Sequence, residues 1–122
     1  MENRENGVST VPQTMLIVDD DFINRSILEN IFSSYYRIEE AEDGEEGLDK
    51  ILRSPVRPCA VLLDVVMPRM NGIEVLRQLQ EKGVTEKIPV FLITAEASDS
   101  VMKEGYQLGV MDVIGKPVVP YV

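Results

Sequence analysis

The chain has 122 residues, a length typical of a single domain. It carries 21 acidic and 12 basic residues, and a net charge of −9 disfavours direct binding to nucleic acid or to an anionic membrane surface. The absence of histidine excludes histidine-based catalysis and a phosphohistidine carrier within this chain, and the single Cys59 cannot form an internal disulfide. Without a long apolar run or a recognisable secretory signal, we expect a cytoplasmic protein with no membrane span.

Residues 1–14 are polar and show no periodicity, so we predict a flexible leader there and one domain over 15–122. Within that domain, short apolar runs alternate with segments of helical periodicity. Strands are predicted at 15–18, 35–40, 60–64, 89–94 and 111–114. Helices are predicted after the Asp19–Asp21 run, at 44–53 with Leu48, Ile51 and Leu52 facing inward, around 73–79, and from Ser98 to Gly109.

Five strands alternating with four helices indicate an α/β fold with an open parallel sheet and right-handed crossovers. The continuously apolar strand at 60–64 favours burial on both faces of the sheet, whereas the more polar strand at 35–40 suits an edge. Pro117 and Pro120 prevent a helix directly after the fifth strand, so a final covering helix is absent from the given chain. We therefore expect one apolar flank of the sheet to be uncovered.

Polar residues stand at the ends of four predicted strands: Asp19 and Asp20, Asp64, Thr94, and Lys116. Ligands of open parallel sheets bind outside the carboxyl ends of the strands, so the strand order 2-1-3-4-5 of flavodoxin-like folds would bring the three carboxylates together. Such a cluster repels itself unless a divalent cation is bound, and Mg²⁺ suits it. With a lysine and a hydroxyl opposite, the arrangement predicts a site for a phosphoryl group.

At these residues the chain resembles the receiver domain of two-component response regulators, the CheY-like superfamily. The resemblance covers roughly residues 14–118 and rests on four motifs that occur in order. They are Leu-Ile-Val-Asp-Asp-Asp at 16–21, Leu-Asp-Val-Val-Met-Pro-Arg-Met-Asn-Gly at 63–72, Ile-Thr-Ala-Glu at 93–96, and Lys-Pro at 116–117. Each motif is weak alone, but the four together are highly specific.

The resemblance implies a role for each matching residue. Asp64 would be the phosphoacceptor, and Mg²⁺ would be held by Asp64, Asp19, Asp20 and the backbone carbonyl of Val66. Thr94 would bond a phosphoryl oxygen and Lys116 would pair with the phosphoryl group, oriented by a cis peptide bond before Pro117.

The implied function is that of a signalling switch. A sensor histidine kinase or a phosphotransfer protein would deliver the phosphoryl group to Asp64, and the surface around the fourth helix and fifth strand would then shift. The chain would not be a conventional enzyme, although Mg²⁺-dependent self-phosphorylation and autodephosphorylation are expected. A C-terminal output domain in the full-length protein is expected, and the resemblance also allows a homodimer.

Two residues, Val113 and Gly115, depart from the family pattern, and two others bear on the lifetime of the phosphorylated state. Val113 stands where receivers commonly have a switching Tyr or Phe, and Gly115 adds backbone freedom just before Lys116. Val66 and Glu96 match positions that tune dephosphorylation in the family. The apolar Val66 predicts that the attacking water is unassisted.

Three other functions are compatible with parts of the sequence. A pseudo-receiver, an interaction module that works without phosphorylation, is the main alternative. A haloacid-dehalogenase-like phosphatase would need its nucleophile after the first strand and a cap, whereas here the candidate Asp64 ends the third strand. A flavodoxin-like cofactor binder is disfavoured because no Gly/Ser/Thr-rich phosphate loop follows the first strand.

Overall fold

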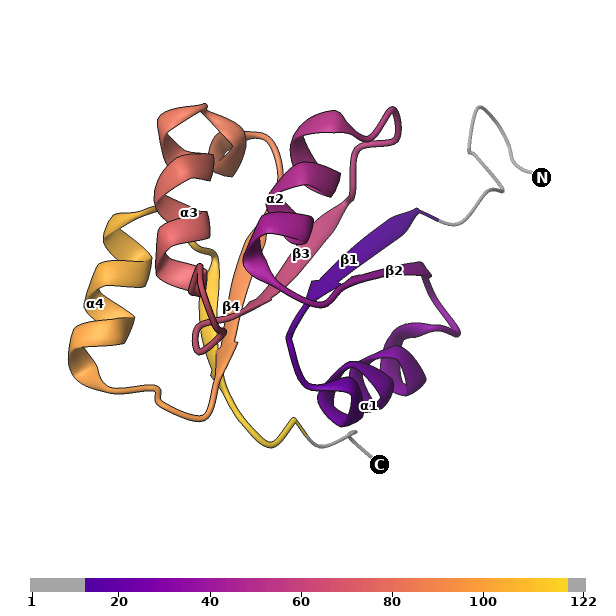
Figure 1. Cartoon of the computed structure of the whole chain (residues 1–122), viewed down its shortest axis with the longest axis horizontal. Coiled ribbons are helices and arrows are strands. Elements are labelled where there is room, and N and C mark those ends of the chain that lie inside the picture. Colours follow the sequence, from indigo (N-terminus) through magenta and orange to yellow (C-terminus); the bar gives the residue numbers. More distant parts are fainter. Residues whose placement is uncertain (1–12, 119–122) are drawn as a thin grey trace.

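Five parallel strands form the centre of the molecule (Figure 1). The structure is a computed structural model and describes residues 13–118. The strand order is β2-β1-β3-β4-β5, as the sequence predicts. The strands are β1 (Thr14–Val18), β2 (Arg37–Ala41), β3 (Ala60–Asp64), β4 (Val90–Thr94) and β5 (Asp112–Gly115). The reversal of strand order lies between β1 and β3, and ligands of such sheets bind at this point.

The helices begin where a polar side chain caps their first turn. They are α1 (Phe22–Phe32), α2 (Gly44–Arg53), α3 (Gly72–Glu81) and α4 (Asp99–Gln107), with a short 3₁₀ turn, η1 (Val84–Glu86), before β4. Their N-cap residues Asp21, Asp43, Asn71 and Ser98 each accept a hydrogen bond from a backbone N–H of the first turn. In the described part of the chain, none of these helices is long and apolar enough to cross a membrane.

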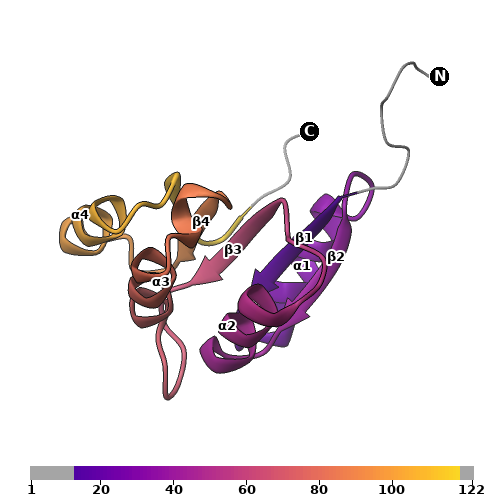
Figure 2. The same cartoon turned by 90° about the horizontal axis from the view of Figure 1, so that it is seen from above.

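Alternate residues of the strands pack against different helical layers. Leu16, Leu63 and Leu92 belong to the core beneath α2, α3 and α4, whereas Ile17 and Leu62 belong to the core beneath α1. Figures 1 and 2 show α1 on one side of the sheet and the other three helices on the opposite side. The central strands are therefore covered on both faces, as their continuous apolar runs predict.

The face that carries α1 is only partly covered. A groove of about 690 Å³ runs beside α1, with Met15, Phe32, Tyr36, Phe91 and Ile114 among its walls. No helix follows β5 within residues 13–118, in agreement with the predicted uncovered flank. The sheet therefore presents apolar surface to water on this side.

The boundaries of several strands differ from the sequence-based predictions. Strand β1 begins at Thr14, inside the predicted leader, of which residues 1–12 lie outside the described part. Strand β2 begins at Arg37 rather than at residue 35, because Tyr35 and Tyr36 donate their N–H groups to the Phe32 carbonyl and form a turn after α1. The predicted fifth strand at 111–114 lies one residue later, as β5.

The prediction that Leu52 faces inward is wrong, because its side chain is 41% exposed. The buried residues of α2 are Gly44, Gly47 and Ile51, which repeat every three or four positions along one narrow stripe. Leu52 follows Ile51 directly and is turned by roughly 100° around the helix, away from the sheet.

Candidate functional site

Three carboxylates meet at the carboxyl end of the sheet. Asp19 follows β1, Asp64 ends β3, and one oxygen from each of these residues and from Asp20 lies within 4.8 Å of the others. Asp19 and Asp64 are almost fully buried, whereas Asp20 is exposed. Two desolvated carboxylates beside one open to solvent form a site that a cation can enter from outside.

Asp19 is held at every polar atom of its backbone and side chain. Its N–H donates to the Ala41 carbonyl (3.1 Å), and its Oδ1 accepts from the Asp21 N–H (2.9 Å). Its carbonyl oxygen accepts from Arg25 Nη1 (2.7 Å), and its Oδ2 accepts from Lys116 Nζ (2.8 Å). The position of this carboxylate is thus set by several elements of the fold.

Arg25 is a residue of this site that sequence reasoning missed. It is buried on α1, and its Nε also donates to Glu40 Oε1 of β2 at 2.9 Å. The one available signal is that Arg25 is the only basic residue in α1, six positions after Asp19. Its partner Glu40 is fifteen residues away along the chain, so the contact cannot be read from local spacing.

Lys116 joins the two buried carboxylates. Its Nζ lies 2.8 Å from Asp19 Oδ2 and 3.3 Å from Asp64 Oδ2, and its backbone N–H donates to the Thr94 carbonyl (2.9 Å). Burial acts to lower the pKa of Lys116, but the hydrogen bond to Asp19 and the attraction of both carboxylates outweigh it, so the pKa is raised. The peptide bond from Lys116 to Pro117 is cis, as predicted.

Asp64 is the titratable group most altered by its surroundings. Burial and, secondarily, repulsion by Asp19 raise the pKa of its carboxyl to about 6, against the opposing effects of Lys116 and of the Val66 N–H, which donates to it. Val66 itself is 54% exposed. Coordination of a metal by the Val66 carbonyl remains a prediction.

The first residue of α3 packs closely against the backbone of Asp64 and Val65. Gly72 donates its N–H to the Val65 carbonyl (2.8 Å), and a Cβ atom at Gly72 would lie 2.1 Å from the Asp64 carbonyl oxygen. Only glycine fits against this backbone. The start of α3 and the phosphoacceptor candidate are therefore packed directly together.

Thr94 ends β4, the strand beside β3, and is fully buried. Its Oγ1 accepts a hydrogen bond from the Glu96 N–H (3.0 Å), so the hydroxyl is engaged with the loop that leads to α4. The structure thus brings Asp19, Asp20, Asp64 and Lys116 together, and it places Thr94 at the same edge of the sheet without a described contact to the carboxylates.

The face formed by α4 and β5 has no aromatic residue at position 113. Val113 is half-buried and packs against the core beneath α3 and α4. Nearby, the Tyr106 hydroxyl donates to Asp112 Oδ1 (2.7 Å) and ties α4 to β5. This hydrogen bond raises the pKa of Tyr106 and lowers the pKa of Asp112.

The donor set of the acidic cluster fits a small divalent cation. All three side chains offer carboxylate oxygens, which hard cations such as Mg²⁺ prefer, and no nitrogen or sulfur ligand belongs to the cluster. Asp20 is exposed, so the cluster is open to solvent on that side.

A fold with this strand order and an acidic cluster beside a lysine defines a CheY-like receiver. The family model of the response regulator receiver domain matches residues 15–121, so the chain belongs to this family. Members of the family are signalling modules of two-component systems rather than conventional enzymes, and they bind Mg²⁺ at an acidic pocket of this kind.

Curated relatives are longer proteins. Response regulator MprA of Mycobacterium sp. strain KMS is 40% identical over 108 residues, which make up 88% of this chain and 45% of that protein. A probable cyclic di-GMP phosphodiesterase of Vibrio cholerae is 38% identical over 105 residues, 86% of this chain and 23% of that protein. The chain therefore spans less than half the length of these relatives.

Solved structures agree with the fold. The CheX–CheY–BeF₃–Mg²⁺ complex of Borrelia burgdorferi matches with a TM-score of 0.83 and 31% identity, covering 90% of this chain and 82% of that one. Chemotaxis protein CheY4 of Vibrio cholerae matches with a TM-score of 0.80 and 27% identity, covering 90% and 91% of the two chains.

Proposed function

We propose that this chain accepts a phosphoryl group on Asp64 and acts as a phosphorylation-dependent switch. The observation that carries the proposal is the contact of Lys116 Nζ with both Asp19 and Asp64 at the carboxyl end of the sheet. A buried carboxylate with a fixed cation beside it offers both a nucleophile and charge compensation for the incoming oxygens.

In the proposed reaction, a carboxylate oxygen of Asp64 attacks the phosphorus of a phosphohistidine on the partner. A P–O bond to Asp64 forms while the P–N bond breaks, and the imidazole nitrogen leaves with the electron pair. Lys116 is positioned to pair with the phosphoryl oxygens, and Thr94 would turn its hydroxyl towards one of them. Water later attacks the phosphorus of the acyl phosphate, which releases inorganic phosphate and restores the Asp64 carboxylate.

Asp19, Asp20, Asp64 and the carbonyl of Val66 would hold Mg²⁺, and the bound ion would offset negative charge on the transferring group. The fixed position of Asp19, held through Arg25, Asp21 and Lys116, supports this assignment. The Mg²⁺ present in the Borrelia burgdorferi complex also supports it, since that CheY shares the fold at 31% identity.

The proposed phosphodonor is a sensor histidine kinase or a phosphotransfer protein. Support comes from α1, which begins beside the acidic cluster and exposes Phe22 (69%) and Ile23 (66%) to solvent. Large apolar side chains exposed next to a reaction centre favour a protein partner over a small molecule alone. Ile23→Glu should slow transfer from a phosphorylated kinase and leave phosphorylation by acetyl phosphate unchanged.

We further propose that residues 15–122 are the receiver of a longer regulator whose output domain follows it. Support comes from the relatives, of which this chain matches 45% or less. The surface of α4 and β5, joined by the Tyr106–Asp112 hydrogen bond, would carry the signal onwards.

The test is the intact mass of the protein after incubation with acetyl phosphate and Mg²⁺. We expect one phosphoryl adduct, lost in Asp64→Ala and lost when EDTA removes the metal. Asp112→Ala is the matched control, because it removes an exposed aspartate outside the site and should retain the adduct. An adduct that persists in Asp64→Ala would disprove the assignment of Asp64, and no adduct at all would favour the pseudo-receiver.

A further inference from the structure

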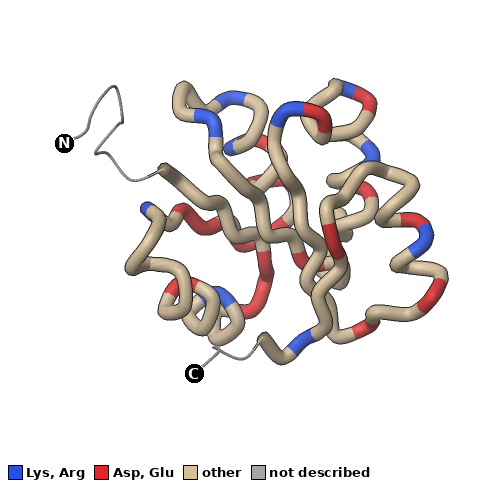
Figure 3. The backbone as a smooth tube through the Cα atoms, turned by 180° about the vertical axis from the view of Figure 1, so that it is seen from behind, with Lys and Arg blue, Asp and Glu red and all other residues tan. Residues whose placement is uncertain are grey.

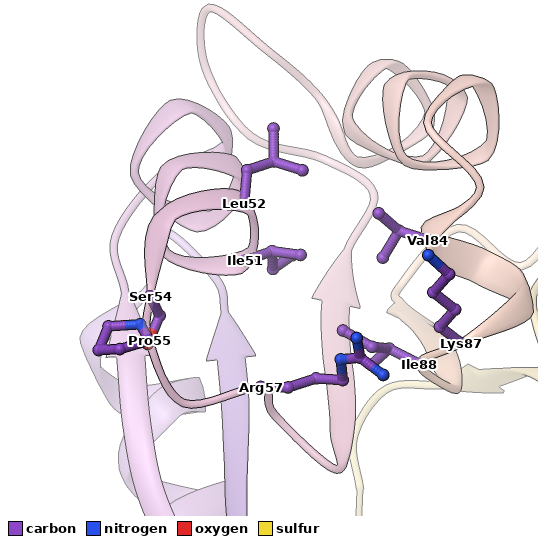
Figure 4. Close-up of a pocket in the computed structure, with 8 residues that line it drawn as sticks. All are labelled: Ile51, Leu52, Ser54, Pro55, Arg57, Val84, Lys87 and Ile88. Atoms are coloured by element: carbon purple, nitrogen blue, oxygen red, sulfur yellow. The ribbon is translucent and has the colours of Figure 1, made fainter.

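A second concave site lies at the opposite end of the sheet from the acidic cluster. It has a volume of about 330 Å³ and lies between the end of α2, the segment that leads into β3, and η1 (Figure 4). The segment after α2 leads into the amino end of β3, and η1 leads into the amino end of β4. The acidic residues instead lie at the carboxyl ends of β1 and β3. The proposed phosphorylation chemistry uses no residue of this pocket.

Aliphatic side chains form one part of the pocket lining, beside polar and charged groups. In Figure 4, Ile51 on α2 points towards Val84 and Ile88 across the opening, and Leu52 lies at the edge beside it. Ile51 and Ile88 are buried and form part of the floor, and Leu52 is 41% exposed at the rim. A volume near the lower limit of ligand pockets is large enough for an aliphatic side chain together with parts of its neighbours in a peptide.

Two cations from separate segments border this apolar surface. Arg57 extends from the segment before β3 and Lys87 from the segment before β4, and both are exposed (Figure 4). Within residues 13–118, neither side chain has an ion pair or a hydrogen bond, although Arg25, Lys50, Arg53, Arg69, Arg77 and Lys116 all pair with carboxylates. In a chain of net charge −9, in which acidic residues outnumber basic ones (Figure 3), both charged side chains that line this pocket are cations.

We propose that this pocket is a docking site for an acidic peptide segment that inserts one large aliphatic side chain between α2 and η1. The aliphatic side chain would contact Ile51, Leu52 and Val84. Carboxylates on either side of it in the peptide would pair with Arg57 and Lys87. Apolar insertion supplies affinity, and the two cations select for acidic flanks and set the orientation of the peptide.

The chemistry of the pocket favours this occupant over a nucleic acid. Only two cations are present, the surrounding chain is acidic, and no aromatic side chain lines the pocket to stack on a base. A peptide with one aliphatic residue and a few carboxylates matches both the size of the pocket and its charge.

The proposal is tested by titrating the ¹⁵N-labelled chain with the peptide Glu-Glu-Leu-Glu-Glu and following the backbone amide signals. We expect shifts confined to residues 51–57 and 84–88. Arg57→Glu combined with Lys87→Glu should weaken binding about tenfold, since two attractive pairs become repulsive. Leu52→Glu should also weaken it, and Glu-Glu-Ala-Glu-Glu and Lys-Lys-Leu-Lys-Lys should bind more weakly than the first peptide.

The matched control is Arg37→Glu combined with Lys103→Glu, which changes the net charge equally at exposed residues outside the pocket. Retained binding in this control, with loss in the pocket variant, supports the proposal. No shifts at either segment would overturn it, as would equal loss in both double variants. Shifts at these segments that depend on protein concentration without peptide would instead identify a second copy as the occupant.

Discussion

The Lys116 ammonium group offsets the repulsion between two buried carboxylates. Asp19 and Asp64 are both nearly inaccessible to solvent, and the ammonium group lies within 3.3 Å of an oxygen of each. A metal ion bound to the same carboxylates would compete with Lys116 for their negative charge. We therefore expect the lysine contact with Asp19 to weaken when Mg²⁺ binds and the contact with an incoming phosphoryl group to replace it.

The pKa of Asp64, raised to about 6, predicts that the free energy of unfolding depends on pH. Above pH 6 the native state must keep the Asp64 carboxylate charged in a buried site, whereas below about pH 3 the group is protonated in both the native and the unfolded state. In metal-free protein, Asp64→Asn should therefore raise the free energy of unfolding at pH 8 by roughly 2 kcal/mol. Urea denaturation followed by circular dichroism measures this difference.

The same comparison at pH 4 is the internal control, because the unfolded carboxyl is itself partly protonated there and the gain from Asp64→Asn should fall to about 0.5 kcal/mol. An equal gain at both pH values would show that the asparagine acts through packing rather than through the charge.

Val66 lies two residues after Asp64 and exposes an apolar side chain beside it. A valine cannot orient water, whereas an asparagine amide can donate to or accept from it. We expect Val66→Asn to speed the loss of the phosphoryl group more than twofold, measured by intact mass after acetyl phosphate is removed. Val56→Asn changes another exposed valine away from the site and should leave the rate unchanged. A change of less than twofold in Val66→Asn would refute the prediction.

At the scale of elements, the first turn of α3 is fixed against the end of β3. A Cβ atom at Gly72 would approach the Asp64 carbonyl oxygen to 2.1 Å, so backbone must move to accommodate it. Gly72→Ala should lower the free energy of unfolding by about 2 kcal/mol and reduce phosphorylation. Gly115→Ala is the matched control, because open space surrounds that position and stability should be retained. Equal thermal melts for Gly72→Ala and the wild type would contradict this packing.

Arg25 connects α1 with both β1 and β2 through Asp19 and Glu40. Removing its charge leaves the Asp19 carbonyl and the partly buried Glu40 without their donor. Arg25→Met should destabilise the chain by about 2 kcal/mol and weaken Mg²⁺ binding. Arg53→Met breaks the exposed pair with Asp49 and should change stability by less than about 0.5 kcal/mol. Similar effects of the two substitutions would show that burial of the Arg25 pair is irrelevant.

These elements show which parts of the structure local patterns can predict. The apolar runs of β3 and β4 and the capping residues Asp21 and Ser98 are local signals, and the structure confirms them. Arg25 was missed because a charged residue in a helix is solvated by default, and its burial depends on a partner from another element. Leu52 was misplaced because the buried stripe of α2 is narrow and begins with two glycines that periodicity of large apolar residues does not reveal.

The candidate site was predictable for a different reason. Polar residues at the carboxyl ends of parallel strands meet at one edge whatever their separation in sequence, so the strand order alone brings Asp19 and Asp64 together. The hydrogen bonds that orient each side chain are not determined by strand order. The engagement of the Thr94 hydroxyl with the Glu96 N–H is one such detail.

For the whole molecule, the acidic cluster predicts that Mg²⁺ stabilises the fold. The three carboxylates converge only in the native state, so an ion that binds them shifts the equilibrium away from the unfolded chain. Mg²⁺ at a hundred times its Kd should add about 2.7 kcal/mol to the free energy of unfolding. The measurement is a thermal melt in Mg²⁺ against EDTA at matched ionic strength. Asp19→Asn should abolish the gain, and a gain that persists in this variant would place the ion elsewhere.

The contact between Asp19 and Lys116 joins residues 97 positions apart in the chain. At ordinary rates of translation, about 5 to 20 residues per second, the ribosome adds Lys116 some 5 to 20 s after Asp19. Throughout that interval the nascent chain holds its acidic residues without the lysine that joins them. We therefore expect the nascent receiver to complete this site only when β5 and Lys116 have been made and docked, which precedes the synthesis of any output domain that follows.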